Sequence, residues 1–206
     1  MRAGTAVLRR WRGCSARAGM KGRMRMDYRI EAMDVLLQAD CILPGYVPLV
    51  RYKEKLLENL RRQGIRSKSA CMTLSDEALL AAGLPDEETV RLFRRFLVMY
   101  DVKPGKLKEI DSVAADEAEA AVFRELYLLP GVKAVRAGLY RKAGYDCLRK
   151  IAAASPEEIL RATAEVIRRE CLVLKAPLPK EIRTHIAVAK ALVDYPVQGE
   201  DGCIQV

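Results

Sequence analysis

LPGVKAVRAGLYRKAGYDCLRKIAAASPEEIL, residues Leu129–Leu160, is the stretch of the sequence that decides the fold. Just before it, apolar residues recur at the spacing of one helix face, namely Phe123, Leu126 and Tyr127. Pro130 cannot continue that helix, and Gly131 tolerates backbone conformations that other residues avoid. We therefore predict two short helices joined by a tight turn and packed against each other as a hairpin.

The helices of this stretch carry end signals of their own. Gly144 ends the second hairpin helix as a C-terminal glycine does. Ser155 is the expected N-cap of the next helix, with Pro156 at its first position and Glu158 completing a capping box. The predicted buried face of the second hairpin helix consists of Val135, Leu139 and Ala143.

An earlier part of the chain has the same pattern. The interval from Gly64 to Ser75 recurs from Gly144 to Ser155, with eleven residues in both copies. The letters SDEALL after the first interval match SPEEIL after the second, and the triplet LPG precedes both. We therefore predict an internal repeat, in which the first copy has six extra residues between its turn and its glycine.

This stretch resembles the helix-hairpin-helix family. The residues that carry the resemblance are Leu129-Pro130-Gly131-Val132, Ala137, Ala143-Gly144-Tyr145 and Ala152-Ala153-Ala154-Ser155-Pro156-Glu157-Glu158. The resemblance implies that backbone amides and basic side chains at the hairpin hold a nucleic-acid phosphate without reading base sequence, although many members use the hairpin only for packing. A second glycine usually follows the first by two residues in that family. Lys133 stands there instead and offers a point charge.

The first copy is similar to SAM-like relatives of this fold, and the whole is similar to bacterial tandem hairpin proteins of the domain-of-unknown-function type. We expect an all-α fold of two helix-hairpin-helix-like (SAM-like) modules packed together. The predicted organisation is a disordered basic tail at 1–26, a first module at 27–100, a linker at 101–115, a second module with a C-terminal helix at 116–195, and a frayed tail at 196–206.

Charge is distributed unevenly along the 206 residues. The formal net charge is +9, but residues 1–26 contain eight basic groups and no acidic one, which leaves the body of the chain close to neutral. Three interpretations of the tail remain open: a basic arm that contacts nucleic acid, an organelle transit peptide, or sequence upstream of a true start at Met20, Met24 or Met26.

Several classes of site are not indicated by the sequence. No apolar run approaches the roughly 20 residues that span a bilayer, so we expect no membrane partner. The six cysteines form no CxxC pair, which argues against zinc and favours reduced thiols in the cytoplasm. His185 has no catalytic partner at a suitable spacing and is expected to be structural. We therefore predict neither a cofactor nor an enzyme.

Basic residues supply the candidate binding site. Around the second hairpin these are Lys133, Arg136, Arg141 and Lys142, together with the backbone at Gly131. Arg91, Arg94 and Arg95 form a second basic stripe at helical spacing, opposite an apolar face. Such stripes contact phosphates in some proteins and are simply the solvated side of a helix in others.

Two hypotheses for the function follow. The first is a non-catalytic module that contacts the DNA or RNA backbone through the hairpin and the basic helix faces. The alternative is a protein–protein adaptor without a nucleic-acid role, which the near-neutral body favours. The sequence predicts no oligomeric state.

Overall fold

Helices account for the regular elements of residues 26–197, which are the residues that the computed structural model describes. The prediction of an all-α fold is therefore confirmed for this part of the chain. The elements are α1 (Ala32–Leu36), the 3-10 helix η1 (Pro44–Tyr52), α2 (Lys53–Arg62), α3 (Lys68–Thr73), α4 (Asp76–Ala81), α5 (Glu87–Leu97), α6 (Pro104–Val113), α7 (Glu117–Leu126), α8 (Ala134–Lys142), α9 (Leu148–Ala153), α10 (Pro156–Arg169) and α11 (Pro179–Asp194).

Short polar side chains fix where several of these helices begin. Ser75, Asp86 and Ser155 each accept a hydrogen bond from the backbone N–H three residues later, at the starts of α4, α5 and α10. At α10 the reciprocal bond is also present, because the Glu158 carboxylate accepts from the Ser155 N–H at 2.7 Å. The capping box predicted from the sequence is therefore confirmed.

The same backbone pattern occurs twice, 80 residues apart. Gly64 ends α2 with φ +77° and Gly144 ends α8 with φ +90°. The N–H of the next residue, Ile65 or Tyr145, returns in both cases to a carbonyl five residues earlier, at 3.0 and 2.8 Å. One short helix follows each glycine, α3 or α9, and a serine-capped helix follows that.

The turns that precede these patterns differ. Gly131 has φ +75°, whereas Gly45 lies within η1 and is not among the residues with positive φ. Pro48 also lies within η1, and α2 begins only at Lys53. The six extra residues of the first copy are therefore accommodated by a long 3-10 helix instead of a tight hairpin turn.

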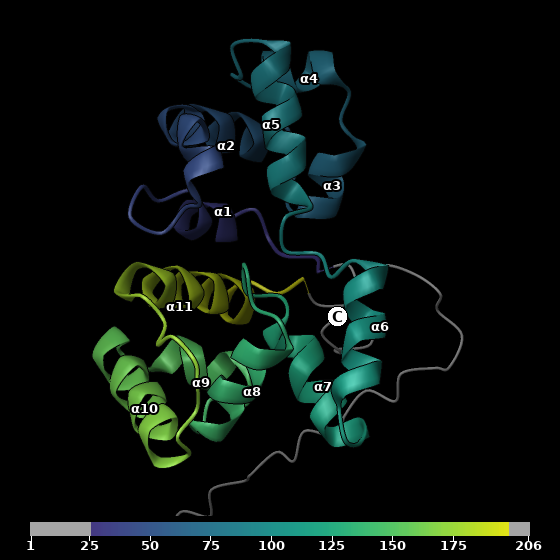
Figure 1. Cartoon of the computed structure of the whole chain (residues 1–206). Coiled ribbons are helices and arrows are strands. Elements are labelled where there is room, and N and C mark those ends of the chain that lie inside the picture. Colours follow the sequence, from purple (N-terminus) through teal and green to yellow (C-terminus); the bar gives the residue numbers. More distant parts are fainter. Residues whose placement is uncertain (1–25, 198–206) are drawn as a thin grey trace, which may run out of the picture.

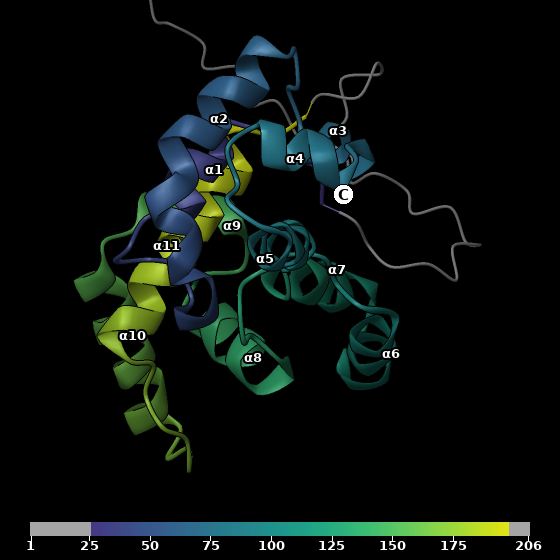
Figure 2. The same cartoon turned by 90° about the horizontal axis from the view of Figure 1, so that it is seen from above.

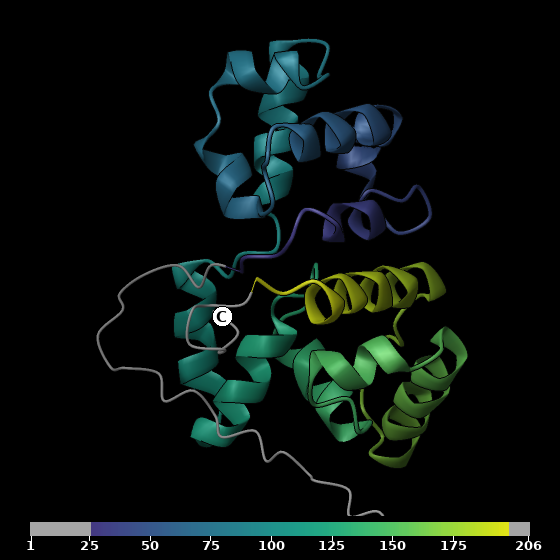
Figure 3. The same cartoon turned by 180° about the vertical axis from the view of Figure 1, so that it is seen from behind.

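Elements α1 to α5 occupy one side of the molecule and α6 to α11 the other, as Figures 1 and 3 show. Helix α11 packs against α9 and α10 and also against α1, so the last helix joins the two sides. Figure 2 shows α1 and α11 together near the middle of the molecule. A single cluster of buried apolar side chains extends through both sides.

The first described residues run between the two sides and are held by both. The Arg29 N–H donates to the Tyr195 carbonyl at 2.8 Å, and the Lys68 N–H donates to the Tyr28 carbonyl at 2.9 Å. The Lys68 ammonium, 4 % exposed, donates to Asp101 Oδ1 at 2.5 Å and to the Met26 carbonyl at 2.7 Å. A buried ion pair thus fixes the start of the described chain.

The segment 101–115, predicted to be a linker, is largely helical. Pro104 occupies the first turn of α6, where its missing N–H costs nothing. Ile110 is fully buried, and α6 packs against both α7 and α8. This segment therefore belongs to the second half of the fold. The predicted tail up to residue 25 and most of the predicted frayed end, residues 198–206, lie outside the described residues.

Within residues 26–197, no helix is both long enough and apolar enough to cross a membrane.

Candidate nucleic-acid interface

The turn between α7 and α8 is built as the sequence predicts. Helix α7 ends at Leu126, and the Val132 N–H closes the turn on the Leu129 carbonyl at 3.2 Å. Gly131 adopts a left-handed conformation that a side chain would make unfavourable. Val132 is fully buried while Gly131 is exposed, so the turn places its glycine at the surface.

Helix α8 starts directly after this turn with its N-terminus open. Lys133 is the N-cap, with extended backbone angles and no side-chain hydrogen bond to the first turn. The first N–H groups of any α-helix lack partners inside the helix, and they carry a partial positive charge. An anion at this point would meet those N–H groups together with the Lys133 ammonium, which is exposed.

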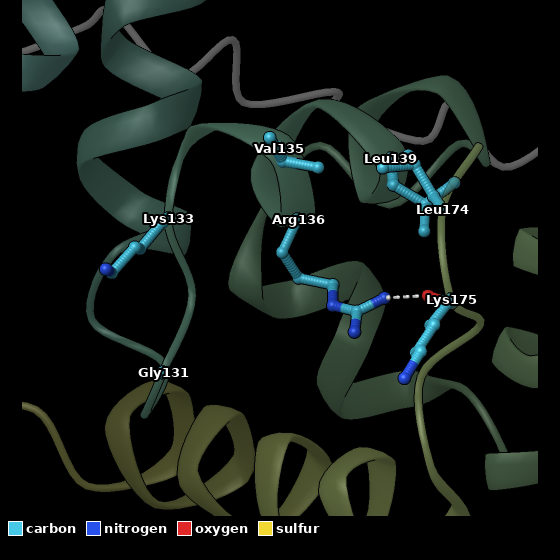
Figure 4. A pocket seen from close by; sticks show the side chains of 7 residues that line it. All are labelled: Gly131, Lys133, Val135, Arg136, Leu139, Leu174 and Lys175. Atoms are coloured by element: carbon cyan, nitrogen blue, oxygen red, sulfur yellow. Dashed lines mark hydrogen bonds between the residues drawn. The ribbon is translucent and has the colours of Figure 1, made fainter. Parts of the chain in front are cut away.

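A shallow groove of about 300 Å³ lies beside this N-terminus. Figure 4 shows the side chains that line it, and they come from the turn, from α8 and from the segment between α10 and α11. Its lining residues are Gly131, Lys133, Val135, Arg136, Leu139, Leu174 and Lys175. The groove therefore combines three basic side chains with an apolar floor.

Arg136 is fixed across the groove. Its guanidinium donates to the Lys175 carbonyl at 3.3 Å, the bond drawn in Figure 4, and its Nε lies 3.0 Å from Glu181 Oε1 on α11. The side chain is about three-quarters buried. Arg136 consequently orders the wall of the groove, but its charge is already partly balanced by Glu181.

Two further lysines from α6 and its N-cap lie near the hairpin. Burial lowers the pKa of Lys106, Glu109 opposes this, and the charges of Lys103 and Lys133 lower it further. The charges of Lys103 and Lys133 therefore both act on Lys106. The Lys106 ammonium also lies 5.8 Å from the centre of the Tyr127 ring, next to the turn.

The structure brings together only part of the predicted site. Gly131, Lys133 and Arg136 line the groove, as the resemblance implies. Arg141 and Lys142 lie at the opposite end of α8, and each forms an ion pair, with Glu119 at 2.6 Å and with Glu170 at 2.5 Å. Their grouping with the hairpin reflects proximity in sequence, not a shared surface.

The basic stripe of α5 belongs to the other side of the molecule (Figure 1). Arg94 binds Asp76 at 2.5 Å and the Leu74 carbonyl at 2.7 Å, so it ties α5 to the start of α4. Arg91 lies 3.8 Å from Glu87. Arg95 is exposed and has no ion pair among the described residues. One cation of this stripe is therefore available to a ligand without breaking an existing contact.

One predicted packing position is wrong. Val135, expected on the buried face of α8, is 64 % exposed and lines the groove. Leu139 is buried as predicted, Ala143 is half-buried, and Ala137 and Tyr140 complete the buried face. Val135 lies in the first turn of α8 and borders the groove, so no other element covers it.

Other chemistry is not indicated within the described residues. No group of three or more histidine, cysteine, aspartate or glutamate side chains there is arranged to hold a metal ion. Comparisons with known proteins find no family model, no curated protein and no solved structure that matches this chain.

Proposed function

We propose that this protein is a non-catalytic binding module that contacts the nucleic-acid backbone, without reading base sequence, at the groove beside α8. One observation supports this most: Gly131, Lys133 and Lys175 line one concave surface beside the open N-terminus of α8. A phosphate is an anion with several hydrogen-bond acceptors, and helix N-termini flanked by lysines suit such groups.

The cations that would contact phosphates are those whose charges are not already balanced. Lys133 and Lys175 are exposed at the groove, with Lys103 and Lys106 nearby. Three or four such contacts give weak binding that depends on salt, with a slope of about −0.9 per phosphate on duplex DNA. The α8 backbone and the lysines lack the geometry of base-edge readout, which requires side chains placed in a groove of the nucleic acid.

We also propose that the two patterns 80 residues apart are repeats of one helix-hairpin-helix-like, SAM-like module. Only the second copy has the tight turn with a left-handed glycine. On this proposal the first copy, whose LPG triplet starts η1, supports the fold and does not bind phosphate.

Charge reversal at the groove tests the proposed function. Lys133→Glu combined with Lys175→Glu should weaken binding to fluorescent duplex DNA by about tenfold or more at roughly 50 mM salt. Arg91→Glu combined with Arg95→Glu is the matched control, because it reverses the same number of charges at two exposed residues of α5. Equal losses from both variants, or no binding of duplex DNA, single-stranded DNA or RNA to the unmodified protein, would refute the proposal.

A protein–protein adaptor is the second candidate, and one observation favours it. Val135, Val173 and Leu178 are 64 %, 101 % and 69 % exposed, around the same groove or in the segment that forms its wall. A protein partner could cover these apolar side chains. Recovery of a partner in pull-downs that Val135→Asp abolishes would support the adaptor, whereas a strictly monomeric protein without partners would contradict it.

A further inference from the structure

Helix α11 reaches the hairpin through a buried histidine. His185 is 1 % exposed, and both of its ring nitrogens have partners from the hairpin. Nε2 lies 2.9 Å from the Pro130 carbonyl oxygen in the turn, and Nδ1 lies 2.7 Å from the Tyr140 hydroxyl on α8. The imidazole also meets the Tyr140 ring edge-on, with 5.7 Å between centroids. One side chain therefore contacts both the turn and the helix that follows it.

These contacts determine which tautomer the neutral ring adopts. A carbonyl oxygen can only accept, so Nε2 carries a hydrogen and donates to Pro130. Nδ1 is then free of hydrogen and accepts from the Tyr140 hydroxyl. Neutral His185 thus satisfies every hydrogen-bonding group in this buried contact.

A second proton would break this arrangement. In the imidazolium, Nδ1 also carries a hydrogen and can only donate to the Tyr140 oxygen. The hydroxyl hydrogen of the buried Tyr140 then loses its acceptor. The positive charge would also lie in an interior from which water is excluded. Protonation therefore favours separation of the turn from α11.

The surrounding charges do not offset this cost. Burial lowers the pKa of His185, the hydrogen bond to Pro130 and the Glu181 carboxylate raise it, and Arg136 lowers it. Arg136 faces the ring from α8 and Glu181 from α11 itself, and these two are joined at 3.0 Å. Helices α1, α9 and α10 also pack on or near α11, and among the described residues none of their charged side chains forms a hydrogen bond or ion pair with His185, Arg136 or Glu181.

We propose that neutral His185 is a positioning residue that holds the Pro130-Gly131 turn against α11, and that acidification releases the turn and with it the groove. The effect on the turn follows from the contacts alone, while the effect on phosphate binding rests on the proposed function. Helix α11 fixes the groove at a second point as well, because Glu181 holds Arg136.

The direction of the pH dependence follows from the lowered pKa. Below the ordinary histidine value of 6.5, the unfolded chain takes up a proton that the folded protein resists. The contribution of neutral His185 to the free energy of unfolding is fully present above pH 6.5. It is lost as the pH falls from 6.5 towards the pKa of the folded state. Between pH 7.5 and 5.5 this site should lower the folding equilibrium constant by up to about tenfold.

The test compares the full-length protein with three variants in denaturant titrations at both pH values. His185→Phe keeps a ring but removes both hydrogen bonds. His185→Gln is a smaller change, because the glutamine amide can still donate to Pro130 but has no group that titrates. Tyr140→Phe is the matched control, because it leaves the bond between Nε2 and Pro130 intact. Between pH 7.5 and 5.5, the folding equilibrium constant of the unmodified protein should fall by up to about tenfold more than that of His185→Gln. Equal losses would overturn the proposal.

Amide hydrogen exchange separates positioning from a general effect on stability. At pH 7.5, exchange at Val132 and Ala137 should accelerate in His185→Phe more than exchange in α2, and Tyr140→Phe should change it less. Uniform acceleration across the molecule would refute a positioning role. If the turn behaves as expected but duplex DNA binds at neither pH, the inference about His185 holds and the proposed function fails.

Discussion

Replacing Lys68 by methionine should be one of the most destabilising single changes in the fold. The ammonium is 4 % exposed and contacts the Asp101 carboxylate, 7 % exposed, at 2.5 Å. Methionine keeps much of the side-chain volume, so packing changes little. The variant removes the ammonium from a buried ion pair, and removing one partner of such a pair costs about 3–5 kcal/mol.

The structure provides a control pair with the same N···O distance but different burial. Arg62 and Glu58 also lie 2.5 Å apart, but their side chains are 71 % and 60 % exposed. Exposed pairs contribute little because water screens them, so Arg62→Met should change stability by less than about 1 kcal/mol. Any difference between the two variants then reports burial, not distance.

The assay is urea unfolding followed by far-ultraviolet circular dichroism, together with thermal melts. A loss of 3–5 kcal/mol corresponds to a fall in Tm of roughly 10 °C in a domain of this size. Part of this loss comes from the Met26 carbonyl, which no longer receives a hydrogen bond from Lys68, at about 1–3 kcal/mol. Equal effects of Lys68→Met and Arg62→Met would refute this reasoning.

Two further predictions concern glycines and cysteines. Gly131→Ala and Gly144→Ala should each cost about 1–2 kcal/mol, because both residues have positive φ while no atom obstructs a Cβ. Gly138→Ala, inside α8 and equally unobstructed, should instead stabilise by about 0.5–1 kcal/mol, and denaturant midpoints distinguish the two cases. Cys71 is fully buried and burial raises the pKa of its thiol to about 12, so alkylation mapped by mass spectrometry should label Cys171, which is exposed, long before Cys71.

Local signals in the sequence were sufficient to predict the ends of several helices. Ser155 and Glu158 form their capping box, and Gly131 and Gly144 adopt the left-handed conformations expected of them. These features depend on contacts between residues a few positions apart, which is the range that a sequence pattern reports.

Features that depend on distant contacts could not be predicted in this way. The Glu181 that balances Arg136 lies 45 residues away, and Glu170 lies 28 residues from Lys142. Sequence spacing therefore overestimated how much of the basic cluster is free. Lys103 and Lys106 went unrecognised because residues 101–115 were interpreted as a linker, although Pro104 is also a signal for the start of a helix.

For His185 the sequence predicted a structural role but not the contacts that the side chain makes. The side chain is 1 % exposed and is hydrogen-bonded through both ring nitrogens. Its partners, Pro130 and Tyr140, are 55 and 45 residues away, so no local pattern could identify them.

The salt dependence of DNA binding tests the central claim most directly. A protein that begins at Met26 lacks the basic residues upstream and retains the groove, so its binding to labelled duplex DNA reports the folded surface alone. We predict that affinity falls by a decade or more between about 50 and 200 mM salt, as expected for several phosphate contacts. Absence of binding at both concentrations would contradict the account and leave the adaptor as the better explanation of the exposed groove.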